Sequence, residues 1–557
     1  MDGADRSSGH TRRGGWITFP FIIGTMACLT LASGGWVVNL IVYLIEEFNI
    51  TSISAAKIYN FVNGSITMFP IVGAVIADSF VGCFSVIWFS SLISLLGILF
   101  LVLTAAIKHL RPPECENGSY PSCKYPSQLQ FAILYFSLSL ASLGNAGTRF
   151  TVAPMGADQF DSPKHQGIFF NWYIFTMYTA TVISSTAIVY VQDNVSWVWG
   201  FSLCVVANVL GLVVFLSGTR FYRLVKPRGS PFKSLACVVS GAISRRRMTL
   251  SENSEDYYHG LHEDPTKKAA TNPTHFFRFL NRAALRTGGC TPPDGSITDP
   301  WKACSTVKEV EDLKILIKIF PLWSTGLLLC TPLAIQLSLS IIQALTMDRH
   351  LGGSHFKVPA GSMAVFILIS TSIFIFVIDR LLFPLWEKFI KRPHTLLQRV
   401  GIGHALNIIS MAVSAVVESK RLKIAQSIDL QNEVNATVPM SAFWLVPQLA
   451  IAGMGEAFHF PGQVALYYQE FPDELKSTST AAVALFIGIA FYFSNALIDL
   501  VRGSTGWLPD DINNGRLDNV YWVCCVVGGL NFGYYLACAS WYKYHIVEKY
   551  EDGCTES

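Results

Sequence analysis

Charged residues are scarce in this chain. Asp, Glu, Lys and Arg make up only 14% of its 557 residues, against roughly a quarter in ordinary soluble domains. The run from Gly24 to Leu44 contains no Asp, Glu, Lys, Arg or His, and apolar residues form 51% of the whole. This composition excludes a soluble globular protein and predicts an all-α membrane protein.

The sequence also lacks the motifs of enzymes. It has no nucleophile–base motif, no cluster of metal ligands and no glycine-rich phosphate loop at a credible spacing. We therefore expect no enzymatic activity, no metal and no cofactor. A basic, amphipathic segment at 275–285 is more typical of contact with lipid head groups than with nucleic acid. The bilayer is thus an expected partner, and nucleic acid is not.

Apolar stretches predict about twelve membrane spans, because a bilayer core of ~30 Å is crossed by about 20 helical residues. They lie at 16–45, 58–77, 84–107, 129–150, 168–191, 196–217, 313–346, 361–386, 396–417, 440–468, 480–501 and 520–542. Arg12 and Arg13 before the first run, with Ala32-Ser33-Gly34 inside it, also resemble a secretory signal. The run continues to Ile45, however, which is too long for a signal core and right for a retained span.

Basic residues indicate the orientation of these spans. The interval 219–312 holds 15 of the 41 Lys and Arg residues, and those that flank span six favour a cytoplasmic position. With twelve spans, both termini are then cytoplasmic. The predicted organisation is an N-terminal six-helix half at 1–218, a cytoplasmic linker at 219–312, a C-terminal six-helix half at 313–545 and a cytoplasmic tail at 546–557. The second span of each half ends in an acidic residue, Asp78 or Asp379, which fits the major facilitator fold.

Exterior loops contain the expected modification sites. Asn-x-Ser/Thr sequons in predicted exterior loops make four asparagines candidates for glycosylation: Asn49, Asn117, Asn194 and Asn435. A fifth sequon, at Asn63, falls inside a span. Among the 13 cysteines, Cys115 and Cys123 share an exterior loop, where a disulfide is plausible.

Ionisable residues inside spans are the main functional candidates, since each costs about 2.5–3.5 kcal/mol to insert. Arg149 ends span four, while Glu456 and His459 lie three residues apart in span ten. Arg149 and Glu456 belong to opposite halves and could form a gating salt bridge. Alternatively, Arg149 extends towards the head groups, and His459 is a neutral histidine that is hydrogen-bonded inside the bundle.

Several motifs resemble one family, the plant nitrate/peptide transporters. They run from span two to span twelve: ADS at 77–79, GADQFD at 156–161, FNW at 170–172, VQDN at 191–194, VEDLK at 310–314, LQRVGIG at 397–403, FWLVPQ at 443–448, GEAF at 455–458 and NGRLD at 514–518. The resemblance implies the major facilitator fold and proton-coupled transport of nitrate, peptides or other small solutes. It also matches Arg149 and Glu456 to the family's basic residue in span four and its glutamate in span ten.

The chain departs from this family in the first span. Members usually carry a Glu-x-x-Glu-Arg/Lys motif there, and its three charged positions correspond to Met26, Leu29 and Thr30. The histidine that contacts nitrate in one branch falls near Leu333, and Cys83 stands where the loop motif commonly has arginine. Without the span-one carboxylates, proton coupling through that motif is impossible.

These departures resemble the nitrate excretion branch, for which EAFHFPG at 456–462 is also typical. The resemblance implies passive, low-affinity efflux of nitrate or chloride across the plasma membrane. Expected substrate-binding residues are Arg149 and His459, with Asn39 and Tyr43 as polar groups of the pocket. Two alternatives stay open: proton-coupled transport of nitrate or a small solute through Glu456 or His459, and a transport-dead regulatory subunit.

Overall fold

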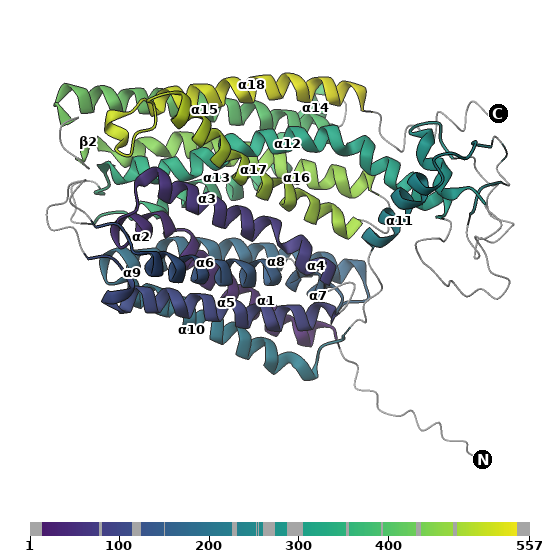
Figure 1. Ribbon diagram of the computed structural model, residues 1–557, viewed down its shortest axis with the longest axis horizontal. Helices are drawn as coiled ribbons and strands as arrows, with labels where there is room; N and C mark the ends of the chain where they lie inside the picture. Colours follow the sequence, from purple (N-terminus) through teal and green to yellow (C-terminus); the bar gives the residue numbers. More distant parts are fainter. Residues whose placement is uncertain are drawn as a thin grey trace, which may run out of the picture.

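Long helices form nearly all of the regular structure. The computed structural model describes residues 14–76, 81–113, 124–149, 151–224, 231–251, 253, 256–259, 273–286, 305–351, 356–391, 394–430, 436–471 and 476–542. Within this part of the chain, ten helical stretches are long and apolar enough to cross a membrane. Figure 1 shows these helices side by side, with the N-terminal ones in one group and the C-terminal ones in another.

Among the described residues of the N-terminal half, ten α-helices build six spans. Short breaks divide some spans; the first is interrupted between α1 and α2, where the Asn39 backbone (φ −100°, ψ 11°) leaves the helical region. A π-helical turn, Ser184–Ile188, joins α8 to α9. The helices are α1 Phe19–Val37, α2 Leu40–Glu46, α3 Ser52–Met68, α4 Pro70–Ile76, α5 Gly82–Ala106, α6 Gln128–Arg149, α7 Val152–Ala157, α8 Pro163–Ile183, α9 Val189–Asn194 and α10 Trp197–Ser217.

The C-terminal half also builds six spans, with longer continuous helices. Capping boxes start two of them: Thr306 with Glu309 before α12, and Thr395 with Gln398 before α15, each satisfying backbone N–H groups of a first turn. The helices are α12 Val307–Leu345, α13 Val365–Val377, α14 Phe383–Ile390, α15 Leu396–Ser427, α16 Val446–Glu470, α17 Lys476–Ser504 and α18 Leu517–Trp541. A π-turn, Ile378–Leu382, joins α13 to α14.

The short elements lie between the spans. Strands β1 (Met347–Asp348) and β2 (Val438–Ser441) pair in parallel. The linker between the halves contributes α11 (Pro231–Ser244) and the 3₁₀-helix η7 (Arg278–Ala284), which pack against each other and against α12. The remaining 3₁₀-helices are η1 Trp16–Thr18, η3 Lys108–Leu110, η5 Gly218–Arg220, η8 Gly361–Ala364, η11 Ala442–Leu445 and η13 Ile512–Asn514.

The predicted all-α membrane class is confirmed, and every predicted span overlaps a helix. Ten of the twelve coincide with the long apolar stretches. The other two, 58–77 and 440–468, are also helical and correspond to α3 with α4, and to η11 with α16. Within the linker segment predicted to be amphipathic, 275–285, residues Arg278–Ala284 form the 3₁₀-helix η7.

Glycine allows the first span to approach its neighbours closely. A Cβ atom at Gly34 would clash with Ser184, and one at Gly35 would lie 2.5 Å from the Cys204 Sγ. Small residues at such crossings let helix backbones come together where the hydrophobic effect cannot drive association. The Gly34-Gly35 pair therefore allows α1 to pack against the π-helical turn Ser184–Ile188 and against α10.

The two ends of the bundle are packed differently. The described N-terminus lies at the end from which the linker leaves, because the Gly14 N–H donates to the Phe221 carbonyl (2.8 Å). We call this end the linker side and the other the far side. Towards the far side, one apolar cluster joins residues of both halves, such as Leu40 and Ile342. Towards the linker side, each half has its own cluster, around Phe169 in one and Tyr467 in the other.

Candidate functional site

Arg149 lies near the last turn of α6, inside a helical stretch that continues to Ala157. Its side chain is exposed, and its backbone carbonyl accepts a hydrogen bond from the Tyr173 hydroxyl of α8 (3.5 Å). Arg149 therefore stays a substrate-binding candidate: it places a guanidinium in a membrane span, where a positive charge favours an anionic solute.

Glu456 lies in the middle of α16, in the opposite half. Its half-buried carboxylate accepts a long hydrogen bond from the Thr371 hydroxyl of α13 (3.5 Å). The Glu456 carboxylate also interacts electrostatically with Tyr178 of α8. Among the ion pairs between described residues, none joins Arg149 to Glu456. The gating salt bridge between Arg149 and Glu456 stays a prediction.

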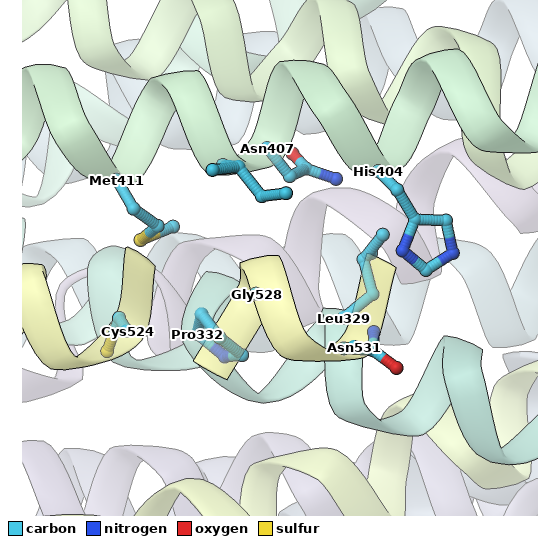
Figure 2. A pocket seen from close by; sticks show the side chains of 9 residues that line it. Leu329, Pro332, His404, Asn407, Met411, Cys524, Gly528 and Asn531 are labelled. Atoms are coloured by element: carbon cyan, nitrogen blue, oxygen red, sulfur yellow. The ribbon is translucent and has the colours of Figure 1, made fainter. Parts of the chain in front are cut away.

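His459 faces a second histidine that sequence reasoning missed. The rings of His459 and His404 of α15 meet edge to face, with centroids 5.1 Å apart, and both residues are buried. Figure 2 shows His404 beside Asn407 on α15, with Asn531 on the facing helix α18. His404 and Asn407 are three residues apart and therefore share one helix face. This spacing is the sequence signal that could have identified His404. A role for His459 in substrate binding stays a prediction.

A small cavity, lined mostly by apolar residues, adjoins this histidine pair. Its free volume is about 10 Å³, which is close to the space that one water molecule needs. The buried atoms His404 Nε2, Asn407 Nδ2 and Asn531 Oδ1 have no hydrogen-bond partner within the protein. Since buried polar groups are nearly always satisfied, we expect a bound water to contact these atoms.

Asn39 and Tyr43 occupy different environments. The Asn39 amide donates to Asp193 of α9 (2.7 Å), on the far side. The Tyr43 hydroxyl is bonded to Thr104 of α5 (2.9 Å), and its ring is buried between Trp197 and Phe201. Both residues therefore support the N-terminal half in this conformation. Their role in substrate binding stays a prediction.

Polar contacts close the far side between the two halves. Arg349, which follows β1, approaches Asp193 with an N–O distance of 3.9 Å, and both side chains are largely buried. Burial lowers the pKa of the Arg349 guanidinium, while the carboxylates of Asp193 and Glu46 raise it. Close by, the Ser362 hydroxyl of η8 donates to the Ser185 carbonyl (2.6 Å). We refer to these residues as the far-side contact.

Replacing Arg349 by glutamine should loosen the far-side contact, because Asp193 would lose its cationic partner across the halves. The test is made in a Ser362→Cys background with a membrane-impermeant thiol reagent. We expect position 362 to be labelled about tenfold faster with Arg349→Gln than with Arg349 kept, a ratio that corresponds to about 1.4 kcal/mol in the opening equilibrium. The matched control is Arg502→Gln, which removes an exposed arginine paired with Asp510. Equal labelling rates in the Arg349 and Arg502 variants would contradict the assignment.

Apolar packing fills the positions of the absent span-one charges. Met26 is 4% exposed and packs in the same cluster as Ile87 and Phe215, and Leu29 is 9% exposed. The Thr30 hydroxyl donates to the Met26 sulfur (3.4 Å). Leu333 of α12, near the position of the family's histidine, packs against two apolar clusters. No proton carrier occupies these four positions.

The predicted modification sites are only partly described. Cys115, Cys123, Asn117 and Asn435 lie outside the described residues. Asn194 is exposed at the end of α9. The Asn49 amide donates to the Pro113 and Lys124 carbonyls (3.1 and 3.2 Å), so a glycan there would have to replace these bonds. Glycosylation and the disulfide stay predictions.

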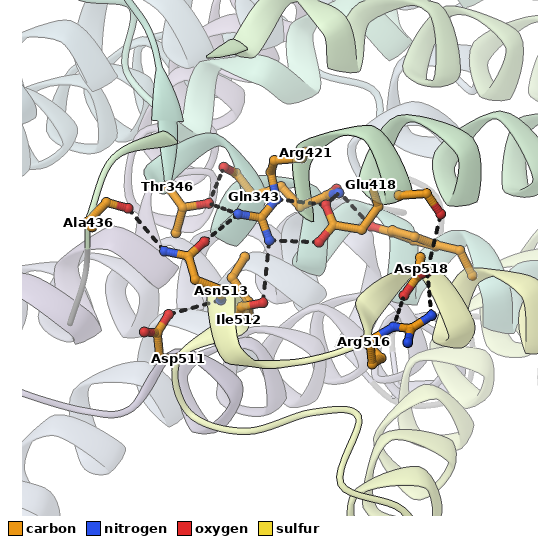
Figure 3. A network of polar contacts seen from close by, with 12 residues as sticks. Gln343, Thr346, Glu418, Arg421, Ala436, Asp511, Ile512, Asn513, Arg516 and Asp518 are labelled. Carbon is orange, nitrogen blue, oxygen red and sulfur yellow. Dashed lines mark hydrogen bonds and ion pairs between the residues drawn. The ribbon is translucent and has the colours of Figure 1, made fainter. Parts of the chain in front are cut away.

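A buried ion pair stabilises the far side of the C-terminal half. Arg421 and Glu418 of α15 are both 0% exposed and 2.7 Å apart. Figure 3 shows their network: Gln343 of α12 donates to Glu418 (2.6 Å), and Arg421 donates to Asn513 of η13 (2.5 Å). The pair thereby ties α12, α15 and the loop before α18 together.

Comparison with known proteins settles the family. The model of the POT family, PTR2, matches residues 84–513. The chain belongs to the POT family. Two relatives from Arabidopsis thaliana, Protein NRT1/ PTR FAMILY 2.7 and 2.6, are 52% and 51% identical to it, over 97% and 98% of this chain and 94% and 96% of their own. This confirms the resemblance to the plant nitrate/peptide transporters.

Solved structures of this POT family confirm the fold. An auto-inhibited POT family peptide transporter matches with a TM-score of 0.69 at 16% identity, covering 95% of this chain and 97% of its own. The POT family transporter PepTSo matches with a TM-score of 0.68 at 17% identity, covering 94% and 99%. The protein is thus a multi-pass membrane transporter of the major facilitator fold.

Proposed function

We propose that this POT family member is a passive exporter of a small inorganic anion, nitrate or chloride, at the plasma membrane. The observation that carries the proposal is the apolar packing of Met26 and Leu29. A titratable acid in the first span could bind and release a proton during the cycle. With apolar side chains in its place, transport through that motif needs no proton.

Arg149 supports an anionic substrate. Its exposed guanidinium lies within a membrane span, and the first-span positions Met26, Leu29 and Thr30 hold no carboxylate that would neutralise the local field. A peptide would require a negative partner for its amino terminus, and these three positions do not supply one. The field at Arg149 therefore favours a small anion over a peptide.

Membrane voltage supplies the driving force in this proposal. A potential that is negative inside pushes a monovalent anion outward by ~2.3 kcal/mol per 100 mV. In the proposed orientation the linker and both termini are cytoplasmic. The anion enters from the linker side, where the halves have separate apolar clusters, and leaves when the far-side contact between Arg349 and Asp193 opens.

A second candidate function keeps proton coupling and uses Glu456. The specific observation is the half-buried carboxylate in the middle of α16. Among the described hydrogen bonds, its oxygens accept only a long one, from the Thr371 hydroxyl. Such a group could titrate during the cycle. His459 is a weaker candidate, because it is only 1% exposed and burial opposes its charged form.

Substitution of Glu456 by glutamine distinguishes the two candidates. If the protein is a passive exporter, the variant should transport nitrate at a fixed voltage within about twofold of the unchanged protein, because glutamine keeps the size and the hydrogen-bonding capacity of the side chain. The flux should also be unaffected by a pH gradient. Loss of pH-driven flux in Glu456→Gln, with surface expression preserved, would instead favour coupling through Glu456.

A further inference from the structure

The linker forms a small folded unit on α12. Val238 and Ala242 of α11 pack with Ala283 of η7 and with Val310 at the start of α12, and all four are at most 6% exposed. Arg245 joins the two parts, since its guanidinium donates to the Ala283 carbonyl (2.5 Å). We refer to α11, residues 245–248 and 276–285 as the linker unit.

The linker unit leaves large apolar side chains uncovered. Val239 and Ile243 of α11 are 43% and 62% exposed, and Phe276 and Phe279 beside η7 are 49% and 52% exposed. Val239 and Ile243 are four residues apart and therefore share one helix face. α11 thus presents apolar residues both to the core of the unit and to its outside.

Exposed basic residues lie close in the chain to these apolar residues. Arg246 and Arg247 lie two and three residues after the end of α11 and are exposed, as is Arg278 between Phe276 and Phe279. Arg245 points inward to Ala283, so the neighbouring arginines are the ones left for an outside partner. Apolar side chains flanked by arginines are the pattern of a segment that lies in a bilayer interface.

The position of the unit agrees with this partner. Figure 1 shows α11 at the end of the bundle, next to the linker-side end of α12. The chain enters the linker from η5, at the end of the sixth span, and leaves it through α12, which is itself a membrane span. Both connections hold the unit near the plane where head groups begin.

We propose that the linker unit docks on an anionic bilayer surface. Val239, Ile243 and the phenylalanines enter the boundary between head groups and acyl chains, and Arg246 and Arg247 bind lipid phosphates and carboxylates. The positive charge of this face selects an anionic leaflet over a neutral one. This interaction is independent of which solute the protein transports.

Hydrogen exchange on the full chain tests this docking. One copy per nanodisc is compared in phosphatidylcholine and in phosphatidylcholine with phosphatidylserine. We expect backbone amides of 236–248 to exchange at least about fivefold more slowly in the anionic discs, and the difference to shrink at high salt. The double variant Arg246→Gln, Arg247→Gln should lose the slowing.

The control variant is Lys108→Gln, which removes an exposed charge from the other end of the bundle and should keep the slowing. Exchange at 307–314 in α12 reports whether the linker unit is still folded in each variant. Equal exchange in both lipids, or slowing that persists in the double arginine variant, would overturn the proposal. Exchange at 236–248 that slows in neutral discs when two copies are enclosed, but not when one copy is, would also overturn the proposal. That result would indicate that a second copy, and not the lipid, covers the linker unit.

Discussion

Anion flux should fall at least about tenfold when Arg149 is replaced by alanine, because a charge-assisted hydrogen bond contributes about 1.5–3 kcal/mol. Arg149 places an exposed cation near the end of α6 within a membrane span, and the first span offers no other charged side chain between Gly24 and Leu44. The measurement is nitrate and chloride flux in proteoliposomes, normalised to the amount of inserted protein.

Arg149→Lys is the matched variant, since it keeps the charge but loses the planar guanidinium. We expect it to retain part of the flux, with a changed ratio of nitrate to chloride, because lysine cannot form the paired hydrogen bonds that suit a planar anion. Normal flux in Arg149→Ala, with protein at the cell surface, would contradict the assignment of Arg149 to substrate binding.

Stability should fall most when Arg421 is replaced by alanine. The substitution leaves Glu418 at 0% exposure without its cation, and removal of one partner of a buried ion pair costs about 3–5 kcal/mol. Asn513 and Thr346 would lose their bonds to Arg421 as well. The measurement is the melting temperature of the purified protein in detergent.

Two variants check this result. Arg502→Ala breaks the exposed pair with Asp510, which contributes only about 0–1 kcal/mol, so its melting temperature should change little. The double variant Glu418→Met, Arg421→Met leaves no unpaired buried charge and should recover part of the lost stability. An Arg421→Ala protein as stable as the Arg502 variant would show that the network in Figure 3 does not hold the far end together.

The spans could be predicted from the sequence because each needs only a local property, a run of about 20 apolar residues. The two predicted spans that are not among the ten long apolar stretches, at α3 with α4 and at α16, could also be predicted. The interruption at Asn39 could not be predicted, since it depends on contacts with Asp193 and η8.

The candidate site was only partly predictable, because its geometry depends on residues far apart in the chain. Arg149 and Glu456 are recognisable as charges within apolar runs. Nothing local indicates that Asp193 meets Arg349, or that His404 faces His459. Arg421 and Glu418 have the spacing of an ordinary surface pair on a helix, and only the packing of α12 and α18 around them makes them buried.

The most direct test of passive export is flux from proteoliposomes that contain only this protein. The voltage is set by a potassium gradient, the pH is equal on both sides, and a protonophore removes any residual proton gradient. We predict nitrate or chloride flux that follows the voltage and reverses with its sign. Anion flux that occurs only when a proton gradient is imposed, and is absent under voltage alone, would contradict the account.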